Sequence, residues 1–471
     1  MQVSGPTGAM VVVLAPIVAQ FGVGAVALLS LMAGAIVVLA GILRMGRLVS
    51  FIPWPVIEGF TAGIGVIIFL QQVPAAFGYT GELPTNALGG AIVSISNASS
   101  DAVISLAIIA VTAAIMIALG KFTPKLPGSF IAILIVSIGV AALKLPVDLI
   151  GELPNSLPAP RLPEASWDMV THLIGPALAV AALAAIESLL SVRVAASMSD
   201  TGPYNADREL VGQGLASISV GFFGGMPVTG AIARTAVNVR SGGRSRFSSI
   251  VHALVLLLVV YAAAKIVAAI PLAALAGVLM VTASRMVSIN VISRIMRTTR
   301  ADALVFIITA IITISVDLVV AVGIGIAVAA FFILRRMSID AGVYREPLEP
   351  SMLGDEKIGL FRIEGALFFG AAERLLQQIM DYDNLDVVIL RLSQIQMIDA
   401  TGAHQLTELV TALERRGVTV IIKGVRKEHI HVLGVLGAIR SLRHENHLFE
   451  DLSEAVEHAR QHVRIEQRKG D

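Results

Sequence analysis

Long apolar stretches recur along the first 335 residues of this chain, and they constrain its fold more than any other feature. Most reach the length of about 20 residues that a helix needs to cross a membrane. The long stretches lie at 24–43, 51–73, 102–119, 129–144, 172–195, 246–270, 272–289, 301–316 and 317–335, and shorter, interrupted ones lie at 6–19, 209–223 and 230–240. With 56% hydrophobic residues and a mean hydropathy of +0.82, the chain is more apolar than soluble domains are. The sequence therefore predicts a polytopic α-helical membrane protein with about twelve crossings or half-crossings.

Lysine and arginine are concentrated in alternate connections between these stretches. Examples are Arg44 and Arg47, Lys121 and Lys125, and Arg335 and Arg336, whereas the loop 74–100 contains neither residue type. Connections rich in lysine and arginine stay on the cytoplasmic side of a membrane. We therefore expect a multi-pass protein of the cell membrane, with the chain after residue 340 in the cytoplasm.

The composition changes near residue 340, where charged residues become frequent. Short β-rich runs (GLFRIEGALFFG, DVVILRL and VTVIIKGV) alternate there with amphipathic stretches (AAERLLQQIMDY and HQLTELVTALERR). This alternation is typical of a small α/β domain in which helices cover a sheet.

Composition and motifs exclude several classes of function. The net charge of +1 gives no reason to expect a nucleic-acid partner, and the absence of cysteine excludes disulfides and thiolate metal sites. The sequence has no Walker loop, no HExxH and no GxSxG motif, so we predict neither an enzyme nor a transporter with its own ATPase, and no cofactor.

Arg234 is an ionisable residue inside an apolar segment, in the stretch GMPVTGAIARTAVN at 225–238. Such a group costs at least about 2.5–3.5 kcal/mol at membrane depth, so it normally faces a partner, a cavity or an anion. The alternative is an arginine that extends to the cytoplasmic interface near Arg240. Pro227 and Gly230 argue against that alternative, because they break a continuous helix and favour a helix start where backbone amides approach an anion.

A second segment resembles this one. Pro6, Thr7, Gly8 and Ala9 at the start of the chain parallel the later run Pro-Val-Thr-Gly-Ala at 227–231. Pairs of short, Pro/Gly-interrupted segments indicate half-helices that meet at a substrate site between transporter repeats. Two helix N-termini beside an arginine would form an electropositive anion site.

Glu187 lies in the middle of the apolar segment LAVAALAAIESLLSVRVAASM. A carboxylate there is either a structural hydrogen-bonding group or a group that couples transport to a proton or to sodium. Ser188 and Ser191 offer oxygen ligands for sodium, and Ser191 lies one helical turn beyond Glu187 on the same face. A cation site next to an anion site is the arrangement of a symporter.

Glu58, in PWPVIEGFTAGIGVIIF, is a second acid near an apolar segment. It lies close to a basic loop, so we interpret it as a structural group that pairs there. The glycines that follow, Gly59 and Gly63, are interpreted as a close helix-packing face.

Three segments resemble the SulP family of inorganic anion transporters: QVSGPTGAM at 2–10, AAIESLLS at 184–191, and ELVGQGLASISVGFFGGMPVTGAIARTAVNVRSGG at 209–243. The similarity extends over nearly the whole chain. MIDATGAHQL at 397–406 resembles the STAS domain that this family carries. The resemblance implies a transmembrane transporter domain at 1–338, a linker at 339–355 and a cytoplasmic STAS domain at 356–465.

The resemblance also implies a fold of two intertwined inverted repeats of seven segments, with the substrate between two half-helices. In this sequence the first half-helix corresponds to the segment from Pro6 to Met10. The second corresponds to Gly230, Ala231, Ile232, Ala233, Arg234 and Thr235. Glu187 matches the acid that serves the coupling cation in family members driven by sodium or protons, and Ser191 matches an assisting hydroxyl.

The sequence departs from the family pattern in two places. The family has two spans before the segment that begins here at Met1, so we expect either a start codon assigned too late or a truncated transporter with about twelve of fourteen segments.

The second departure is in the STAS domain, because related STAS domains carry a phosphorylatable serine directly after the motif's aspartate. Here Ala400 follows Asp399, then come Thr401, an alternative acceptor, and Gly402. We interpret Asp399 mainly as the cap of the following helix.

Together these features predict secondary transport of a small inorganic oxyanion, sulfate or bicarbonate, coupled to sodium or protons. Homodimerisation, and a cytoplasmic protein partner for the STAS domain, are expected from the resemblance alone. The alternative is a transport-inactive membrane anchor that presents the STAS domain to such a partner.

Overall fold

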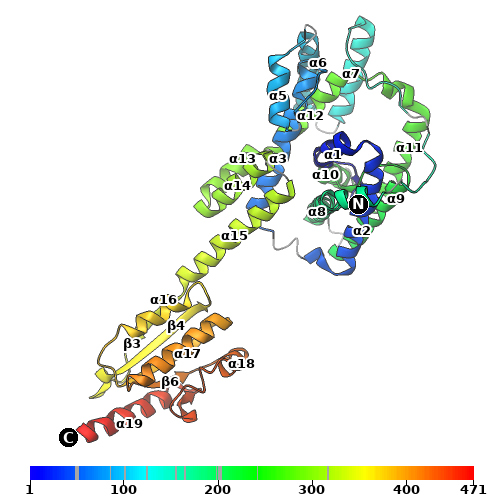
Figure 1. Ribbon diagram of the computed structural model, residues 1–471. Coiled ribbons are helices and arrows are strands. Elements are labelled where there is room, and N and C mark those ends of the chain that lie inside the picture. The colour runs from blue at the N-terminus through cyan, green and yellow to red at the C-terminus, as the bar shows by residue number, and fades with distance from the viewer. Residues whose placement is uncertain are drawn as a thin grey trace. The chain divides into compact units, whose positions relative to one another are not determined.

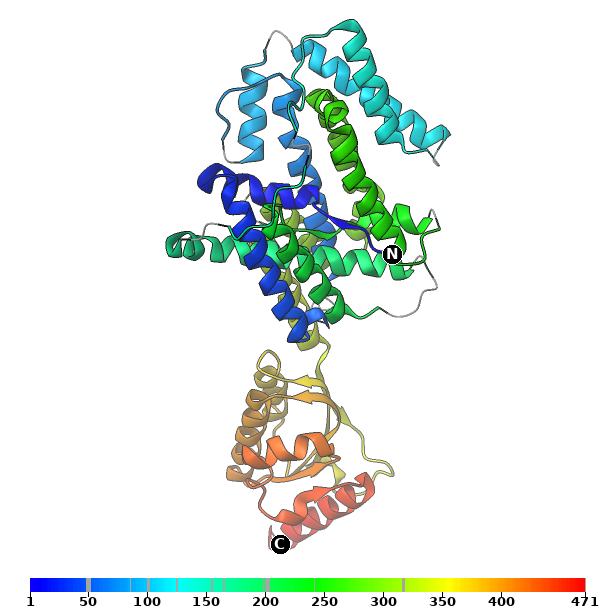
Figure 2. The same cartoon turned by 90° about the vertical axis from the view of Figure 1, so that its right-hand side faces the viewer.

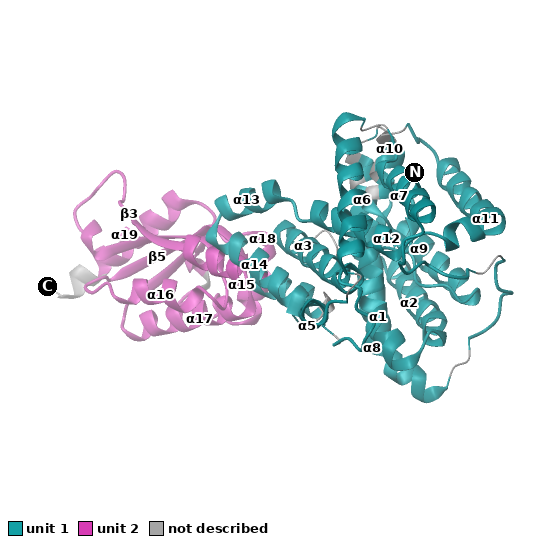
Figure 3. Ribbon diagram, turned by 90° about the horizontal axis from the view of Figure 1, so that it is seen from above, with its two compact units in different colours: residues 1–329 teal, residues 330–471 magenta. Residues whose placement is uncertain are grey.

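The computed structural model describes residues 1–47, 52–84, 86–99, 102–123, 126–153, 156–163, 166–197, 199, 204–240, 242–315 and 318–470 (Figure 1). The chain forms two compact units, residues 1–329 and 330–471, which are coloured separately in Figure 3.

The first unit consists almost entirely of helices. They are α1 (Gly8–Phe21), α2 (Gly24–Ile42), α3 (Trp54–Gln71), α4 (Val73–Ala76), α5 (Ala87–Ser96), α6 (Ala102–Phe122), α7 (Gly128–Leu143), α8 (Trp167–Ser197), α9 (Ala206–Phe222), α10 (Ile232–Arg240), α11 (Phe247–Ala268), α12 (Leu272–Met286), α13 (Ile289–Arg297) and α14 (Arg300–Ser315), and α15 (Leu318–Asp340) ends in the second unit. Within the described residues, seven helices are long and apolar enough to cross a membrane.

Most helices coincide with the predicted apolar stretches, but α5, α13 and the four-residue helix α4 were not predicted. Helix α5 lies inside 74–100, which was expected to be a loop. Its ten residues begin at Ala87, and the side chain of the preceding Asn86 caps the helix by accepting a hydrogen bond from the Gly89 amide. Helix α13 is amphipathic and rich in arginine, so hydropathy alone does not detect it.

Glycines allow the closest contacts between helices in this unit. A Cβ atom at Gly59 of α3 would lie 2.6 Å from the Phe306 carbonyl oxygen of α14, and one at Gly63 would lie 2.6 Å from the Thr313 Cβ. The predicted packing role of Gly59 and Gly63 is therefore confirmed. Glu58 accepts a hydrogen bond from the Trp54 Nε1 of its own helix at 2.9 Å.

The second unit is built on one five-stranded sheet. Its strands, in the spatial order β3-β4-β5-β6-β7, are β3 (Gly342–Glu346), β4 (Ile358–Leu367), β5 (Val387–Ile398), β6 (Thr419–Lys423) and β7 (Leu448–Phe449). Strand β3 pairs antiparallel with β4, and the other neighbours are parallel. Since parallel strands need covered faces, the helices α16 (Ala372–Met380), α17 (Ala400–Arg415), α18 (Lys427–Val435) and α19 (Leu452–Gly470) complete the fold.

The two faces of this sheet have separate apolar cores. Phe361 and Leu390 lie in the core that contains the apolar residues of α16 and α17. Leu360 and Ile389, the alternate residues of the same strands, pack instead with Ala459 of α19. Successive side chains of each strand therefore point to opposite faces of the sheet, one covered by α16 and α17 and the other by α19.

The predicted linker at 339–355 needs a correction. Residues 342–346 form strand β3, and Glu346 accepts hydrogen bonds from Arg362 and Arg391 at 2.8 and 3.0 Å. The segment is thus part of the sheet. It was missed because GVYRE is short and polar, as edge strands often are.

Arg460 anchors α19 to the segment before β4. Its Nε and Nη2 donate to the two carboxylate oxygens of Asp355 at 2.9 and 2.8 Å, and Nη2 also donates to the Pro350 carbonyl at 2.7 Å. Both charged side chains are at most 10% exposed. This hydrogen bonding keeps the pKa of Asp355 below its usual value.

Replacing Asp355 with asparagine should weaken the docking of α19 by about 3 kcal/mol, because Arg460 keeps a buried charge without its counterion. Hydrogen exchange of α19 in the purified full chain should then accelerate by about 100-fold. The matched control is Asp386→Asn, which removes the more exposed Lys357–Asp386 pair at 3.8 Å; its effect should stay below about 1 kcal/mol. Equal protection in both variants would contradict the anchoring role.

The same pair predicts a pH dependence for α19. Because the pKa of Asp355 is lowered in the folded chain, the contribution of the pair is complete at neutral pH. It should be lost only as the pH falls below about 4, the value of an unfolded aspartate. Hydrogen exchange at pH 7 and pH 5 should therefore report equal stability of this contact.

Candidate functional site

Two short strands join the beginning of the chain to a segment more than 220 residues later. Strand β1 (Ser4–Gly5) pairs antiparallel with β2 (Thr229–Gly230), with Ser4 opposite Gly230 and Gly5 opposite Thr229. The Ala231 amide extends the pairing by donating to the Val3 carbonyl at 2.9 Å. Helices α1 and α10 each begin within three residues of these strands, so the pairing brings two helix N-termini together. Figure 2 shows the N-terminal strand in dark blue beside the N label.

The N-terminus of α1 is capped by Thr7. Its hydroxyl oxygen accepts a hydrogen bond from the Met10 amide at 3.3 Å and donates to Glu187 Oε2 at 2.9 Å. Pro6 and Gly8 are exposed, whereas Ala9 is buried. The amides of Gly8 and Ala9 belong to the first turn, where backbone N–H groups have no partner within the helix. The predicted helix start at Pro6–Ala9 is therefore present.

The N-terminus of α10 is held by buried hydroxyl groups. The Gly230 amide donates to Ser188 Oγ at 3.0 Å, and Ser188 Oγ lies 3.1 Å from Thr229 Oγ1. Ala231 and Thr235 are buried and Ile232 is half-buried. Ala233 lies in the helix, and its side chain is outside the described part of the structure.

Arg234 lies in the first turn of α10 and reaches the other half-helix. Its Nη2 donates to the Pro6 carbonyl oxygen at 2.6 Å, and the side chain is exposed. The guanidinium therefore lies just before the first turn of α1, beside Pro6 and Gly8, which are also exposed. This direction differs from the alternative of an arginine extended along α10 toward Arg240.

Glu187 and Ser191 lie one turn apart on α8 and contact different half-helices. The half-buried Glu187 accepts from Thr7 of α1. The buried Ser191 donates to Thr235 Oγ1 of α10 at 2.8 Å, and Thr235 Oγ1 in turn accepts from the Val3 amide at 3.0 Å. Helix α8 thus links both half-helices through these two polar residues.

Two amide side chains near the site were not predicted. Gln2 Nε2 donates to the Ser188 carbonyl at 3.0 Å. The buried Gln213 of α9 donates through Nε2 to Ser4 Oγ at 2.5 Å and to Glu209 Oε1 at 3.0 Å. Both support β1, and the signal that points to them is an amide in or beside an apolar segment.

This geometry combines a centre that attracts anions with a carboxylate beside it. Two helix N-termini and the Arg234 guanidinium present positive charge and N–H donors on one side. The carboxylate of Glu187 lies behind Thr7, the capping residue of one of these helices. The arrangement places donors suited to an oxyanion beside a carboxylate suited to a cation, and among these residues it offers no paired nucleophile and base for covalent chemistry.

In the second unit, Asp399 caps α17 as predicted. Its Oδ1 accepts from the Gly402 amide at 2.7 Å and its Oδ2 from the Phe369 amide at 3.2 Å. Thr401 is exposed in the first turn, and Gly402 is buried against the carbonyl of Leu367, where a side chain would collide. The loop joins β5 to α17 tightly, and the exposed hydroxyl of Thr401 lies beside the cap.

Replacing Asp399 with alanine should destabilise the start of α17 by about 1–2 kcal/mol, because the Gly402 amide loses its acceptor. Hydrogen exchange in residues 400–406 of the full chain should accelerate by about 5- to 30-fold. Thr401→Ala is the control and should leave exchange unchanged, since its side chain is exposed. Unchanged exchange in Asp399→Ala would show that the cap does not hold this helix.

Comparison with known proteins decides the family. Residues 1–309 match the Sulfate permease family. The chain belongs to this family. Residues 349–455 match the STAS domain, so the second unit is a STAS domain, as the motif at 397–406 predicted.

Two relatives match most of the chain. The Putative sulfate transporter YvdB of Bacillus subtilis is 32% identical over 452 residues, which cover 93% of this chain and 85% of the relative. The Bicarbonate transporter BicA of Synechocystis is 28% identical over 482 residues, covering 97% of this chain and 85% of the relative. Both relatives are named as transporters, in agreement with the prediction from the motifs that the chain is not an enzyme.

Solved structures confirm the predicted fold class. The structure of SLC26A9 superposes on this chain with a TM-score of 0.85 at 16% sequence identity. The match covers 99% of this chain and 83% of the SLC26A9 chain. The transmembrane domain of a cyanobacterial bicarbonate transporter BicA superposes with a TM-score of 0.60 at 31% sequence identity. This match covers 68% of this chain and 84% of the BicA domain. The chain therefore combines a helical anion-transporter fold with a C-terminal STAS domain.

Proposed function

We propose that this protein carries a small inorganic oxyanion, sulfate or bicarbonate, across the cell membrane, driven by a gradient of sodium or protons. The observation that carries the proposal is the meeting of the α1 and α10 N-termini, with Arg234 bonded across to Pro6. The printed names of YvdB and BicA, a putative sulfate transporter and a bicarbonate transporter, support these two anions as the candidates.

The anion is proposed to bind between the two half-helices. The amides of Gly8 and Ala9 on one side, and of Ile232 and Ala233 on the other, lie in first turns and are available as donors by their position. Arg234 now donates to the Pro6 carbonyl, and an anionic oxygen is a stronger acceptor for a guanidinium than a carbonyl is. We therefore expect the bound anion to draw this side chain away from Pro6.

The cation is proposed to act through Glu187. When a proton or sodium ion neutralises the carboxylate, its hydrogen bond from Thr7 weakens, and Thr7 is the cap of α1. Cation binding therefore changes the same helix end that holds the anion, which couples the two sites by one side chain. Ser191 acts in this proposal by holding α10 through Thr235, and as a sodium ligand only if it turns toward Glu187.

The orientation of the protein in the membrane is proposed from the distribution of its lysine and arginine residues. The STAS domain lies on the cytoplasmic side, where it is available to a cytoplasmic protein partner. Homodimerisation in the membrane is part of the proposal and can be measured on the purified chain by mass photometry.

The test is uptake of labelled sulfate and labelled bicarbonate into proteoliposomes that contain the purified chain. Each anion is tested under an inward sodium gradient, an inward proton gradient and no gradient, with protein-free liposomes as the background. The proposal expects one anion to accumulate above its external concentration under one gradient. Uptake equal to the background for both anions would instead support a membrane anchor that presents the STAS domain.

A further inference from the structure

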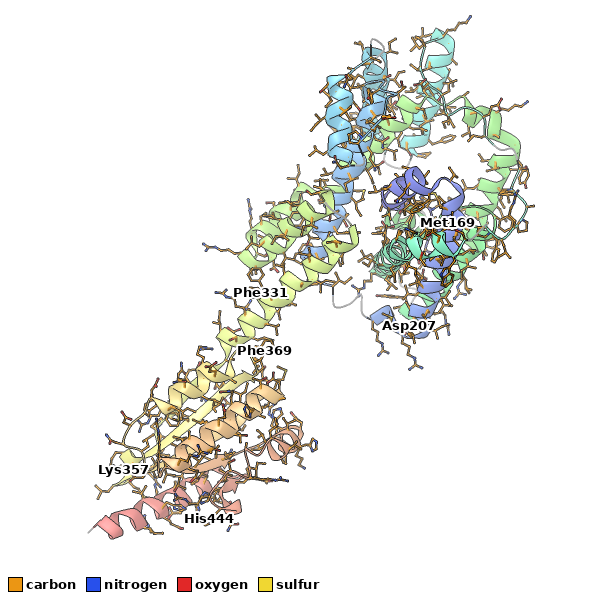
Figure 4. All side chains as sticks on the ribbon, in the orientation of Figure 1. Met169, Asp207, Phe331, Lys357, Phe369 and His444 are labelled. Atoms are coloured by element: carbon orange, nitrogen blue, oxygen red, sulfur yellow. The ribbon has the colours of Figure 1, made fainter. Side chains whose placement is uncertain are left out.

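Three histidines gather at the edge of the STAS sheet in the second unit. His447 ends the 3₁₀ turn η3 (Glu445–His447) directly before β7, and His458 and His462 lie one turn apart on α19. One ring nitrogen from each of the three lies within 4.8 Å of those from the other two. His444, labelled in Figure 4, lies just before this turn.

The spacing of two of the nitrogens fits a tetrahedral metal site. The Nε2 atoms of His458 and His462 are 3.3 Å apart. Two nitrogens bound to one ion at about 2.0–2.1 Å with tetrahedral angles are about 3.4 Å apart. The His447 ring centroid lies 5.3 Å from that of His458 and 5.2 Å from that of His462, so its ring lies beside both of the others.

The backbone fixes which nitrogen of His447 is available. Its Nδ1 lies 3.1 Å from the Val420 carbonyl oxygen. Because a carbonyl oxygen can only accept, Nδ1 carries the hydrogen and Nε2 keeps its lone pair. Metal-binding histidines are oriented in this way, with the second nitrogen donating to a carbonyl or carboxylate.

The three rings lie between the sheet and the last helix. His447 is 1% exposed, and His458 and His462 are half-buried. Ala455, Ala459 and Val463 of α19 pack on the sheet, so the two helix histidines lie beside this apolar face, toward β7. A bound ion would therefore join α19 to the turn before β7.

We propose that His447, His458 and His462 bind one divalent first-row transition-metal ion, with Zn²⁺ as the best fit and water in the fourth position. Three imidazoles suit Zn²⁺, Ni²⁺ or Cu²⁺, whereas Mg²⁺ and Ca²⁺ prefer oxygen ligands. The ion clamps α19 onto the sheet edge and adds to the anchoring by Arg460. The site is separate from sodium binding at Glu187 and does not depend on the proposed transport function.

The test is Zn²⁺ binding to the purified full chain, carrying an affinity tag without histidine and stripped with a chelator. Isothermal titration should give one site per chain, and hydrogen exchange of α19 should slow when Zn²⁺ is added. Co²⁺ in place of Zn²⁺ should give the visible absorption of a tetrahedral nitrogen-ligated ion. In the His458→Gln/His462→Gln double variant the affinity should fall by about 100-fold or more.

The matched control is His431→Gln, an exposed histidine on α18 of the same domain, which should bind Zn²⁺ as the parent chain does. Exchange protection of β4 and β5 without metal verifies that each variant is folded, and His462→Gln alone serves if the double variant is not. The proposal is overturned if the parent chain binds no Zn²⁺, or if the histidine variants that fold bind it with the affinity of the parent.

Discussion

Replacing Glu187 with glutamine is expected to abolish gradient-driven accumulation of the anion while leaving the protein folded. Glutamine has the shape of glutamate and can still accept the hydrogen bond that Thr7 donates to Glu187, but it takes up neither a proton nor the charge of sodium. At zero membrane potential a tenfold gradient of one coupling cation is worth about 1.4 kcal/mol and supports about tenfold accumulation. The internal-to-external ratio of labelled anion in proteoliposomes should therefore fall from about ten to one.

The matched control for this change is Glu58→Gln. Glu58 is also an acid in an apolar helix, but its hydrogen bond is to Trp54 one turn away, and it lies on α3, outside the half-helix pair. Accumulation should persist in this variant. Concentrative uptake by Glu187→Gln at the parent level would remove Glu187 from the coupling mechanism.

Replacing Arg234 with alanine should raise the anion concentration for half-maximal uptake by about 10- to 100-fold, because a charge-assisted hydrogen bond worth about 1.5–3 kcal/mol is lost. Arg234→Lys keeps the charge but not the two-pronged geometry, so its effect should be intermediate. The measurement is the initial rate of uptake as a function of anion concentration, with the cation gradient held constant.

Arg208→Ala provides the control for the loss of one positive charge. Arg208 is exposed near the start of α9 and should leave half-saturation unchanged. If Arg234→Ala also leaves half-saturation unchanged, the arginine only links α10 to Pro6 and does not hold the anion.

Sequence reasoning predicted the elements whose signals are local. The apolar stretches predicted the long helices, and Pro6 and Gly230 correctly indicated two helices that start within the unit. Asp399 was recognised as a cap because capping depends on residues three apart in the sequence. In each case the physical cause lies within a few neighbouring residues.

Long-range contacts could not be predicted in the same way. The pairing of β1 with β2 joins two residues each across more than 220 positions, and such short strands carry no periodic pattern. Likewise Glu187 and Ser191 share a helix face, yet one bonds to Thr7 and the other to Thr235. The choice of partner depends on where α1 and α10 pack, which helical spacing does not determine.

Some elements of the STAS domain could be predicted from the sequence, and others could not. Its alternating strands and amphipathic helices were visible in the sequence, but edge strand β3 was too short and polar to be recognised. His458 and His462 have the i, i+4 spacing of a helix pair, but the third member, His447, reaches them only through the fold of the η3 turn. The spacing of these histidines in the sequence therefore does not indicate the proposed metal site, which joins a turn to a helix.

The proposed transport mechanism requires the anion to bind between the N-termini of α1 and α10. The most direct measurement is the position of bound selenate, a sulfate analogue whose selenium scatters X-rays anomalously, in crystals of the purified chain. We expect an anomalous peak within hydrogen-bonding reach of the Gly8 and Ala9 amides and the Arg234 guanidinium. A peak elsewhere, in a protein that takes up selenate, would contradict it.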